Sequence, residues 1–123
     1  MRVFKSKWFR RFADKENIED AALLEAVARA NEGQFDANLG GDVLKMRIAR
    51  QGEGSAAGYR TIVIFRRGTK AFFVYGFAKS SRANIDDHEK KQFKDAARRV
   101  LALTDKQLAE LLKGGDFVEV KIQ

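Results

Sequence analysis

The sequence predicts an α+β fold in which helices pack on a small antiparallel sheet. Two runs rich in β-branched and aromatic residues, Tyr59 to Arg66 and Ala71 to Ala78, flank Arg67-Gly68-Thr69 and predict a hairpin. A third run, Val43 to Ala49, alternates apolar and basic residues with period two, as a half-buried strand does. Helical spacing of apolar residues precedes and follows these strands. The chain of 123 residues is long enough for one domain with its own core.

The hairpin is expected at the centre of the sheet, because apolar residues occupy both of its faces. In its first strand, Ile62 and Ile64 fall on one face, and Val63 and Phe65 fall on the other. A strand that is apolar on both sides is more often central than at an edge. Arg60 interrupts the Ile62/Ile64 face, and a cation there is costly unless an anion meets it.

The strand from Val43 to Ala49 has two chemically different faces. Leu44, Met46 and Ile48 are expected to lie against helices. Lys45 and Arg47 then stand side by side on the opposite face.

The positive charge of the chain is concentrated in the region of the sheet. The chain has 24 Lys and Arg residues against 17 Asp and Glu residues, a net charge of +7. Between residues 43 and 85, Glu53 is the single acid against nine basic residues: Lys45, Arg47, Arg50, Arg60, Arg66, Arg67, Lys70, Lys79 and Arg82. Such a surface is expected to bind a polyanion, usually nucleic acid. The alternative is a solubilising face that happens to be basic.

The N-terminal helix is predicted to begin after Ser6, which is a favourable N-cap residue. Trp8, Phe9 and Phe12 share one face of this helix, and packing in the core is the expected role of these rings. Stacking on RNA bases is the alternative role.

Caps and periodicity predict the remaining elements. Further helices are expected from about Ile18 to Glu32, from Asp86 to about Leu103 and from Thr104 to Lys113. Short strands are expected at Arg2 to Lys5 and Phe117 to Ile122, and polar connections at Phe35 to Gly41 and Arg50 to Gly58.

Composition excludes several classes of site. The chain has no cysteine and one histidine, so disulfides, thiolate chemistry and a protein-only zinc site are not expected. No cofactor is expected either. No apolar run approaches the roughly 18 residues that a membrane span needs, and no secretory signal is recognised at the N-terminus. We therefore expect a bacterial-type cytoplasmic protein.

The segments LKMRIA, GYR and FFVYGFAKSSRANI, followed by an acidic helix start, resemble the RelE/HigB-like toxins of bacterial type II toxin–antitoxin systems. The resemblance covers roughly residues 1 to 103 of a single domain spanning residues 1–123, with a C-terminal extension at about 104–123. It implies an antiparallel meander with two N-terminal helices packed on one face and a C-terminal helix. It also implies a metal-independent endoribonuclease that cuts mRNA, associated with the ribosome and silenced by a cognate antitoxin, which we expect to be of the helix-turn-helix type.

The resemblance also implies which residues act on RNA. The catalytic set consists of five basic residues that match the family's positions: Lys45, Arg47, Arg60, Lys79 and Arg82. Further RNA contacts are expected from Arg50, Arg66, Lys70, Ser80 and Ser81. Many members carry a catalytic tyrosine or histidine after the last strand, where this chain has Ile85, Asp86 and His88. His88 is the candidate acid or base, and a solvated surface histidine is the alternative.

The implied reaction is attack of the RNA 2′-OH on the adjacent phosphorus. Arginine suits the charge that develops on the phosphate, because its planar guanidinium is always charged and matches phosphate geometry. A second class of function stays open, a basic RNA-binding or regulatory module without chemistry.

Overall fold

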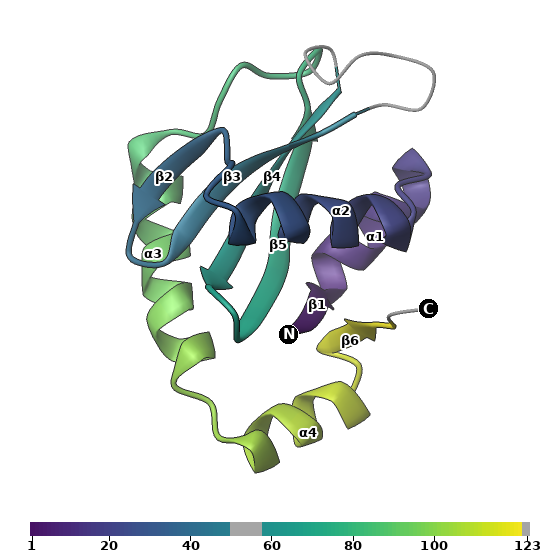
Figure 1. Cartoon of the computed structure of the whole chain (residues 1–123), viewed down its shortest axis with the longest axis vertical. Coiled ribbons are helices and arrows are strands. Elements are labelled where there is room, and N and C mark those ends of the chain that lie inside the picture. Colours follow the sequence, from purple (N-terminus) through teal and green to yellow (C-terminus); the bar gives the residue numbers. More distant parts are fainter. Residues whose placement is uncertain (50–57, 122–123) are drawn as a thin grey trace.

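The computed structural model describes residues 1–49 and 58–121, in which a six-stranded sheet carries helices on both faces (Figure 1). The helices are α1 (Lys7–Glu16), α2 (Asp20–Asn31), α3 (Asp87–Leu101) and α4 (Asp105–Lys113). The strands are β1 (Arg2–Ser6), β2 (Ala37–Gly40), β3 (Val43–Ile48), β4 (Tyr59–Arg66), β5 (Lys70–Ala78) and β6 (Phe117–Val120). These elements confirm the predicted α+β class.

The strands lie in the order β2-β3-β4-β5-β1-β6. The predicted hairpin, β4 and β5, occupies the centre, and its strands pair with Arg60 opposite Phe77 and Ile62 opposite Tyr75. The pairing of β1 with β5 is parallel, whereas the other neighbouring strands are antiparallel. The sheet is therefore largely antiparallel, as expected, with one parallel pair.

Each face of the sheet is covered by its own core. The face toward α1 and α2 includes Phe9, Leu23, Leu44, Met46, Ile48, Val63 and Phe73. The face toward α3 and α4 includes Phe4, Ile62, Ile64, Phe72, Ala97 and Leu108. Both alternation sets of β4 are thus buried, which confirms the prediction of a central strand.

Side-chain caps fix the starts of three helices. The Ser6 hydroxyl accepts a hydrogen bond from the N–H of Phe9, as predicted for α1. Capping boxes begin α3, with Asp86 and Glu89, and α4, with Thr104 and Gln107. Each cap satisfies N–H groups that have no partner within the helix.

The C-terminal segment is joined to the sheet. The last strand, β6, pairs antiparallel with β1, and Val3 lies opposite Val120. Arg2 donates two hydrogen bonds of 2.9 Å to the Glu119 carboxylate across this pair. No helix in the described part of the chain is both long and apolar enough to cross a membrane.

Two predictions for single segments were wrong. The expected polar connection Phe35 to Gly41 contains the edge strand β2, which pairs with β3 through a register shift between Asn38 and Gly40. Gly40 has a φ of 85°, which glycine adopts without a steric penalty. Trp8 is not in the core: it is 47% exposed, whereas Phe9 is buried. Phe9 packs against the buried Phe73, whereas Trp8 packs against Phe12 and Tyr75, which are themselves only half-buried.

Candidate functional site

Three of the predicted catalytic cations meet at one carboxylate, that of Asp36. Arg47 Nε lies 2.9 Å from Oδ1 of Asp36, and Arg60 Nε lies 3.3 Å from Oδ2. Lys45 Nζ lies 3.7 Å from the same Oδ2. Within residues 1–49 and 58–121, three positive groups thus surround one negative group, which is a positive excess among the described side chains.

Strand pairing explains why these residues converge. Arg47 on β3 lies directly opposite Arg60 on β4. Lys45 is two residues from Arg47 on the same strand and therefore points to the same face. Asp36 immediately precedes β2, and its N–H donates to the carbonyl of Lys45 at 2.9 Å. The edge strand β2 thereby holds the carboxylate against the basic face of β3.

The members of the cluster differ in their access to solvent. The side chains of Arg60 and Lys45 are 6% and 16% exposed, whereas that of Arg47 is 46% exposed. A surface hollow of about 380 Å³ opens beside Asp36 and Arg47, and Arg29, Gln34 and Phe35 complete its lining. A ligand therefore reaches the cluster first at Arg47.

The cations keep Asp36 ionised. Burial raises the pKa of its carboxyl, but the hydrogen bond from Arg47 and the charges of Lys45, Arg47 and Arg60 outweigh burial, so the pKa lies below its usual value. Asp36 is thus a carboxylate at neutral pH and is a poor proton acceptor.

Arg82, another of the five predicted catalytic cations, is held by a separate network of hydrogen bonds. It donates to both carboxylate oxygens of Glu89, at 3.1 and 2.6 Å, and to the hydroxyl of Tyr75 at 3.1 Å. The Glu89 hydrogen bonds, followed by that to Tyr75, raise the pKa of Arg82, and the hydrogen bond from Arg82 lowers the pKa of Glu89. Asn84 connects this segment to the first cluster, because its Oδ1 accepts from Lys45 Nζ at 3.4 Å.

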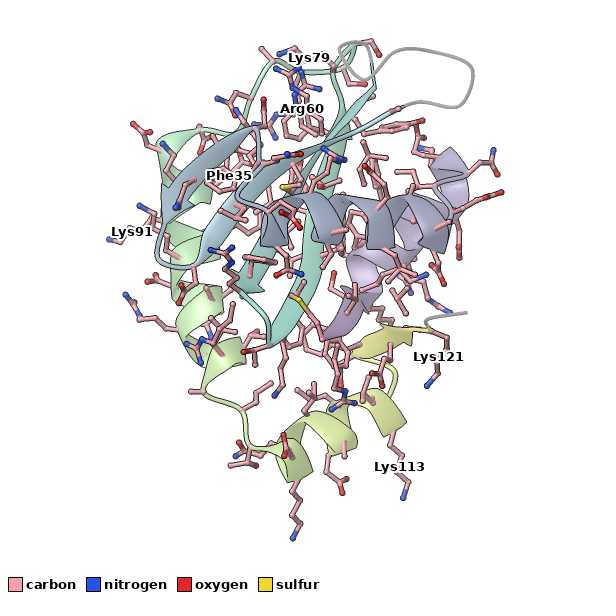
Figure 2. The ribbon with its side chains drawn as sticks, in the orientation of Figure 1. Phe35, Arg60, Lys79, Lys91, Lys113 and Lys121 are labelled. Atoms are coloured by element: carbon pink, nitrogen blue, oxygen red, sulfur yellow. The ribbon has the colours of Figure 1, made fainter. Side chains whose placement is uncertain are left out.

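The remaining predicted residues around the end of β5 lie at the surface. Lys79, Ser80, Ser81 and His88 are exposed. Figure 2 shows Lys79 and Arg60 toward the same end of the molecule, with Lys113 and Lys121 toward the other end. Lys79 makes no side-chain ion pair within residues 1–49 and 58–121, so its ammonium group is available to a ligand.

The structure does not bring Arg66 and Lys70 to this site. They face each other at the opposite end of the β4–β5 hairpin, six residues along the strand from Arg60, or roughly 20 Å. Arg66 approaches Asp42 at 3.7 Å, and Lys70 approaches Asp105 at 3.6 Å. Arg50 falls outside the described residues.

Four polar residues of the site were missed in the sequence: Asp36, Tyr75, Asn84 and Glu89. Asp36 lies in the segment that was predicted to be a polar connection, and Glu89 lies in the acidic helix start, to which no site role was assigned. Asp36 could have been anticipated from Arg60. A cation on an apolar strand is costly, which indicates that an anion must lie close to its side chain.

The fold and the site define a small basic α+β protein with cations clustered at one end of its sheet. The family model described as "RelE toxin of RelE / RelB toxin-antitoxin system" matches residues 1–120, and the chain belongs to this RelE toxin family. It is accordingly a toxin of a toxin–antitoxin system, for which a cognate antitoxin is the partner. The match continues through α4 and β6, beyond the segments that carried the resemblance. No curated protein matches the chain.

Proposed function

We propose that this toxin is a metal-independent endoribonuclease that cleaves mRNA in association with the ribosome and so inhibits translation. The observation that carries the proposal is the convergence of Lys45, Arg47 and Arg60 on Asp36, with Lys79 toward the same end of the molecule. A cluster with a positive excess attracts an anion, and its arginines match the planar geometry of a phosphate.

The proposed reaction uses the 2′-OH of the RNA as its nucleophile. A bond forms between the 2′-oxygen and phosphorus, and the bond from phosphorus to the 5′-oxygen breaks. The products are a 2′,3′-cyclic phosphate and a 5′-hydroxyl. The 2′-OH loses a proton and the departing 5′-oxygen gains one, so the reaction consumes no other reagent.

Charge stabilisation is assigned to Arg60 and Arg47. Arg60 is nearly buried, and an electrostatic interaction with a developing charge is stronger where water is excluded. Proton transfer is assigned to exposed groups at the same end, for which Lys79 and His88 are the candidates. Arg82 has a positioning role, because Glu89 already neutralises it.

The arrangement favours a reaction that depends on the ribosome. The carboxylate of Asp36 is held by cations and is a weak base, so the site lacks a strong general base within the cluster. Such a site would gain most from the ribosome, which would hold the RNA in the orientation that in-line attack requires. We therefore place the protein in the cytoplasm, on translated mRNA.

The proposed antitoxin, of the helix-turn-helix type, neutralises the toxin by covering its basic end with an acidic segment. The excess of basic over acidic residues in the sheet region supports this mode of inhibition. Association of toxin and antitoxin should therefore be fast and sensitive to salt.

A specific observation also favours the alternative, a basic RNA-binding module without chemistry: both Asp36 and Glu89 already neutralise part of the predicted catalytic set. The experiment that separates the two is induced expression of the toxin, alone and together with the product of the neighbouring gene. Growth arrest with new mRNA 5′ ends, mapped by primer extension and suppressed by the neighbouring product, is expected. RNA binding without new 5′ ends would favour the alternative.

A further inference from the structure

We propose that Trp8, supported by Tyr75, forms a stacking subsite for an unpaired RNA base beside the phosphate-binding cations. This inference rests on the proposed function, because it specifies how the same RNA is held. It assigns a binding role to an aromatic residue outside the predicted catalytic set.

The Trp8 indole is exposed and yet supported by other rings. It is 47% exposed, and its ring centroid lies 4.6 Å from that of Tyr75 and 5.4 Å from that of Phe12. Tyr75 in turn contacts Phe93 of α3 at 5.5 Å. A ring held in this way has few conformations to lose when a flat ligand stacks on it.

Single exposed apolar residues are common, but Trp8 extends a continuous series of rings. The described residues include three exposed large hydrophobic side chains, namely Met1, Trp8 and Phe35. Of these, Trp8 has ring contacts with two other aromatic residues, and both of those are themselves half-buried. The series runs from the exposed Trp8 through Tyr75 of β5 to Phe93 of α3, both of which are half-buried.

The register of the sheet places this series beside the cation cluster. Lys45 on β3 lies opposite Ile62 on β4, and Ile62 lies opposite Tyr75 on β5. Tyr75 is thus two strand spacings, or about 10 Å, from Lys45. Arg82 joins the two regions, since its Nη1 donates to the Tyr75 hydroxyl. A short stretch of single-stranded RNA spans this separation.

Charge complementarity indicates RNA as the occupant. The helix that carries Trp8 also carries Lys7, Arg11 and Lys15, which are exposed and make no ion pair within the described part of the chain. Aromatic rings flanked by cations are the usual means by which proteins hold single-stranded nucleic acid. An apolar protein partner would gain nothing from these charges.

The test uses the intrinsic fluorescence of the protein, because Trp8 is the only tryptophan of the chain. The probes are a short 2′-O-methyl RNA, which cannot be cleaved by 2′-OH attack, and the same strand with abasic positions. Binding of each labelled strand is followed separately by fluorescence polarisation. We expect both strands to bind and the base-containing strand alone to quench Trp8.

Two variants provide a matched pair. Trp8→Leu removes the aromatic face and should weaken binding of the base-containing strand roughly 5- to 100-fold, the range for loss of one base–aromatic stack. It should leave binding of the abasic strand unchanged. Trp8→Phe keeps an aromatic ring and should retain most of the affinity. Thermal melts establish that both variants fold, and the wild-type quenching result does not depend on them.

Binding of both strands without a change in Trp8 fluorescence would overturn the stacking subsite and leave the proposed function intact. Failure of both strands to bind at low salt would also overturn the stacking subsite, whereas the proposed function is tested separately by mapping the 5′ ends of translated mRNA. Quenching by the antitoxin but not by RNA would identify the ring as a protein contact and would also refute the inference.

Discussion

The guanidinium of Arg60 on β4 meets the carboxylate of Asp36, which precedes β2, with 3.3 Å between Nε and Oδ2. This contact explains how a nearly buried cation is tolerated on an apolar strand face. Lys45 and Arg47 reach the same carboxylate, so one acid partly compensates three bases. The remaining positive charge is what an RNA phosphate would meet.

Asp36→Asn should destabilise the protein by roughly 1–3 kcal/mol, because three cations lose their shared anion in a partly buried site. Urea denaturation measures the effect. Asp42→Asn is the matched control: its partner Arg66 is half exposed, and such surface pairs contribute about 0–1 kcal/mol. Equal stability of Asp36→Asn and the wild type would contradict the assigned role of Asp36.

The contribution of Asp36 to stability should depend on pH in one direction. Its pKa is lowered in the folded state, so the folded protein binds fewer protons at this site than the unfolded chain. The contribution is fully present above the unfolded pKa of about 3.9 and is lost as the pH falls through the lower folded value. The difference in unfolding free energy between wild type and Asp36→Asn should thus be constant from about pH 5 to 8 and shrink in stronger acid. A difference that grows in acid would be inconsistent with the lowered pKa.

RNA affinity should fall steeply as salt rises, since phosphate contacts release counterions. Lys45→Ala or Arg47→Ala should each flatten the slope of log affinity against log salt by about one unit. Arg66→Ala should change the slope little, because Arg66 lies at the far end of the hairpin. Polarisation titrations at several salt concentrations measure the slopes. Equal slopes for the three variants would mean that the RNA does not contact the Asp36 cluster.

Gly76→Ala should destabilise the fold by roughly 1–3 kcal/mol, the usual effect of overpacking a core. A Cβ atom at Gly76 would lie 2.6 Å from Cε2 of Phe12 and 3.2 Å from Cε1 of Phe9. The Phe12 ring must therefore shift, together with the Trp8 ring stacked on it. Gly114→Ala, where the nearest atom is at 3.4 Å, is the control and should have little effect in thermal melts. Similar melting of Gly76→Ala and the wild type would show that Phe12 moves freely.

Period-two patterns predicted the central strands well, because apolar residues mark the strand faces that are buried. The hairpin of β4 and β5 and the two faces of β3 follow from residue type alone. The edge strand β2 does not, because its residues Ala37 to Gly40 include alanine, asparagine and glycine, which are rare in strands, and because its pairing depends on backbone hydrogen bonds to β3. Asp36 was missed for the same reason.

The sequence predicted the part of the site that lies on the paired strands. Lys45, Arg47 and Arg60 converge because β3 pairs with β4, and their alternation is visible in the sequence. The partners of Arg82 were not predictable, since they depend on how the segment after β5 folds back toward α3. Trp8 shares a helical stripe with Phe9, but helical spacing cannot show that Phe9 packs on the buried Phe73 while Trp8 stays exposed against Tyr75.

The most direct test of the proposed function is the cleavage of translated mRNA by Arg60→Ala, with 5′ ends mapped by primer extension and folding checked by a thermal melt. Loss of one charge-stabilising donor should lower cleavage roughly 10²–10³-fold in a protein that still folds. Arg60→Lys should not restore full activity, because an ammonium group cannot reproduce the planar fork, and Arg66→Ala should cut normally. If Arg60→Ala folds and cuts mRNA at the wild-type rate, Arg60 is a structural residue and the Asp36 cluster is not the catalytic centre.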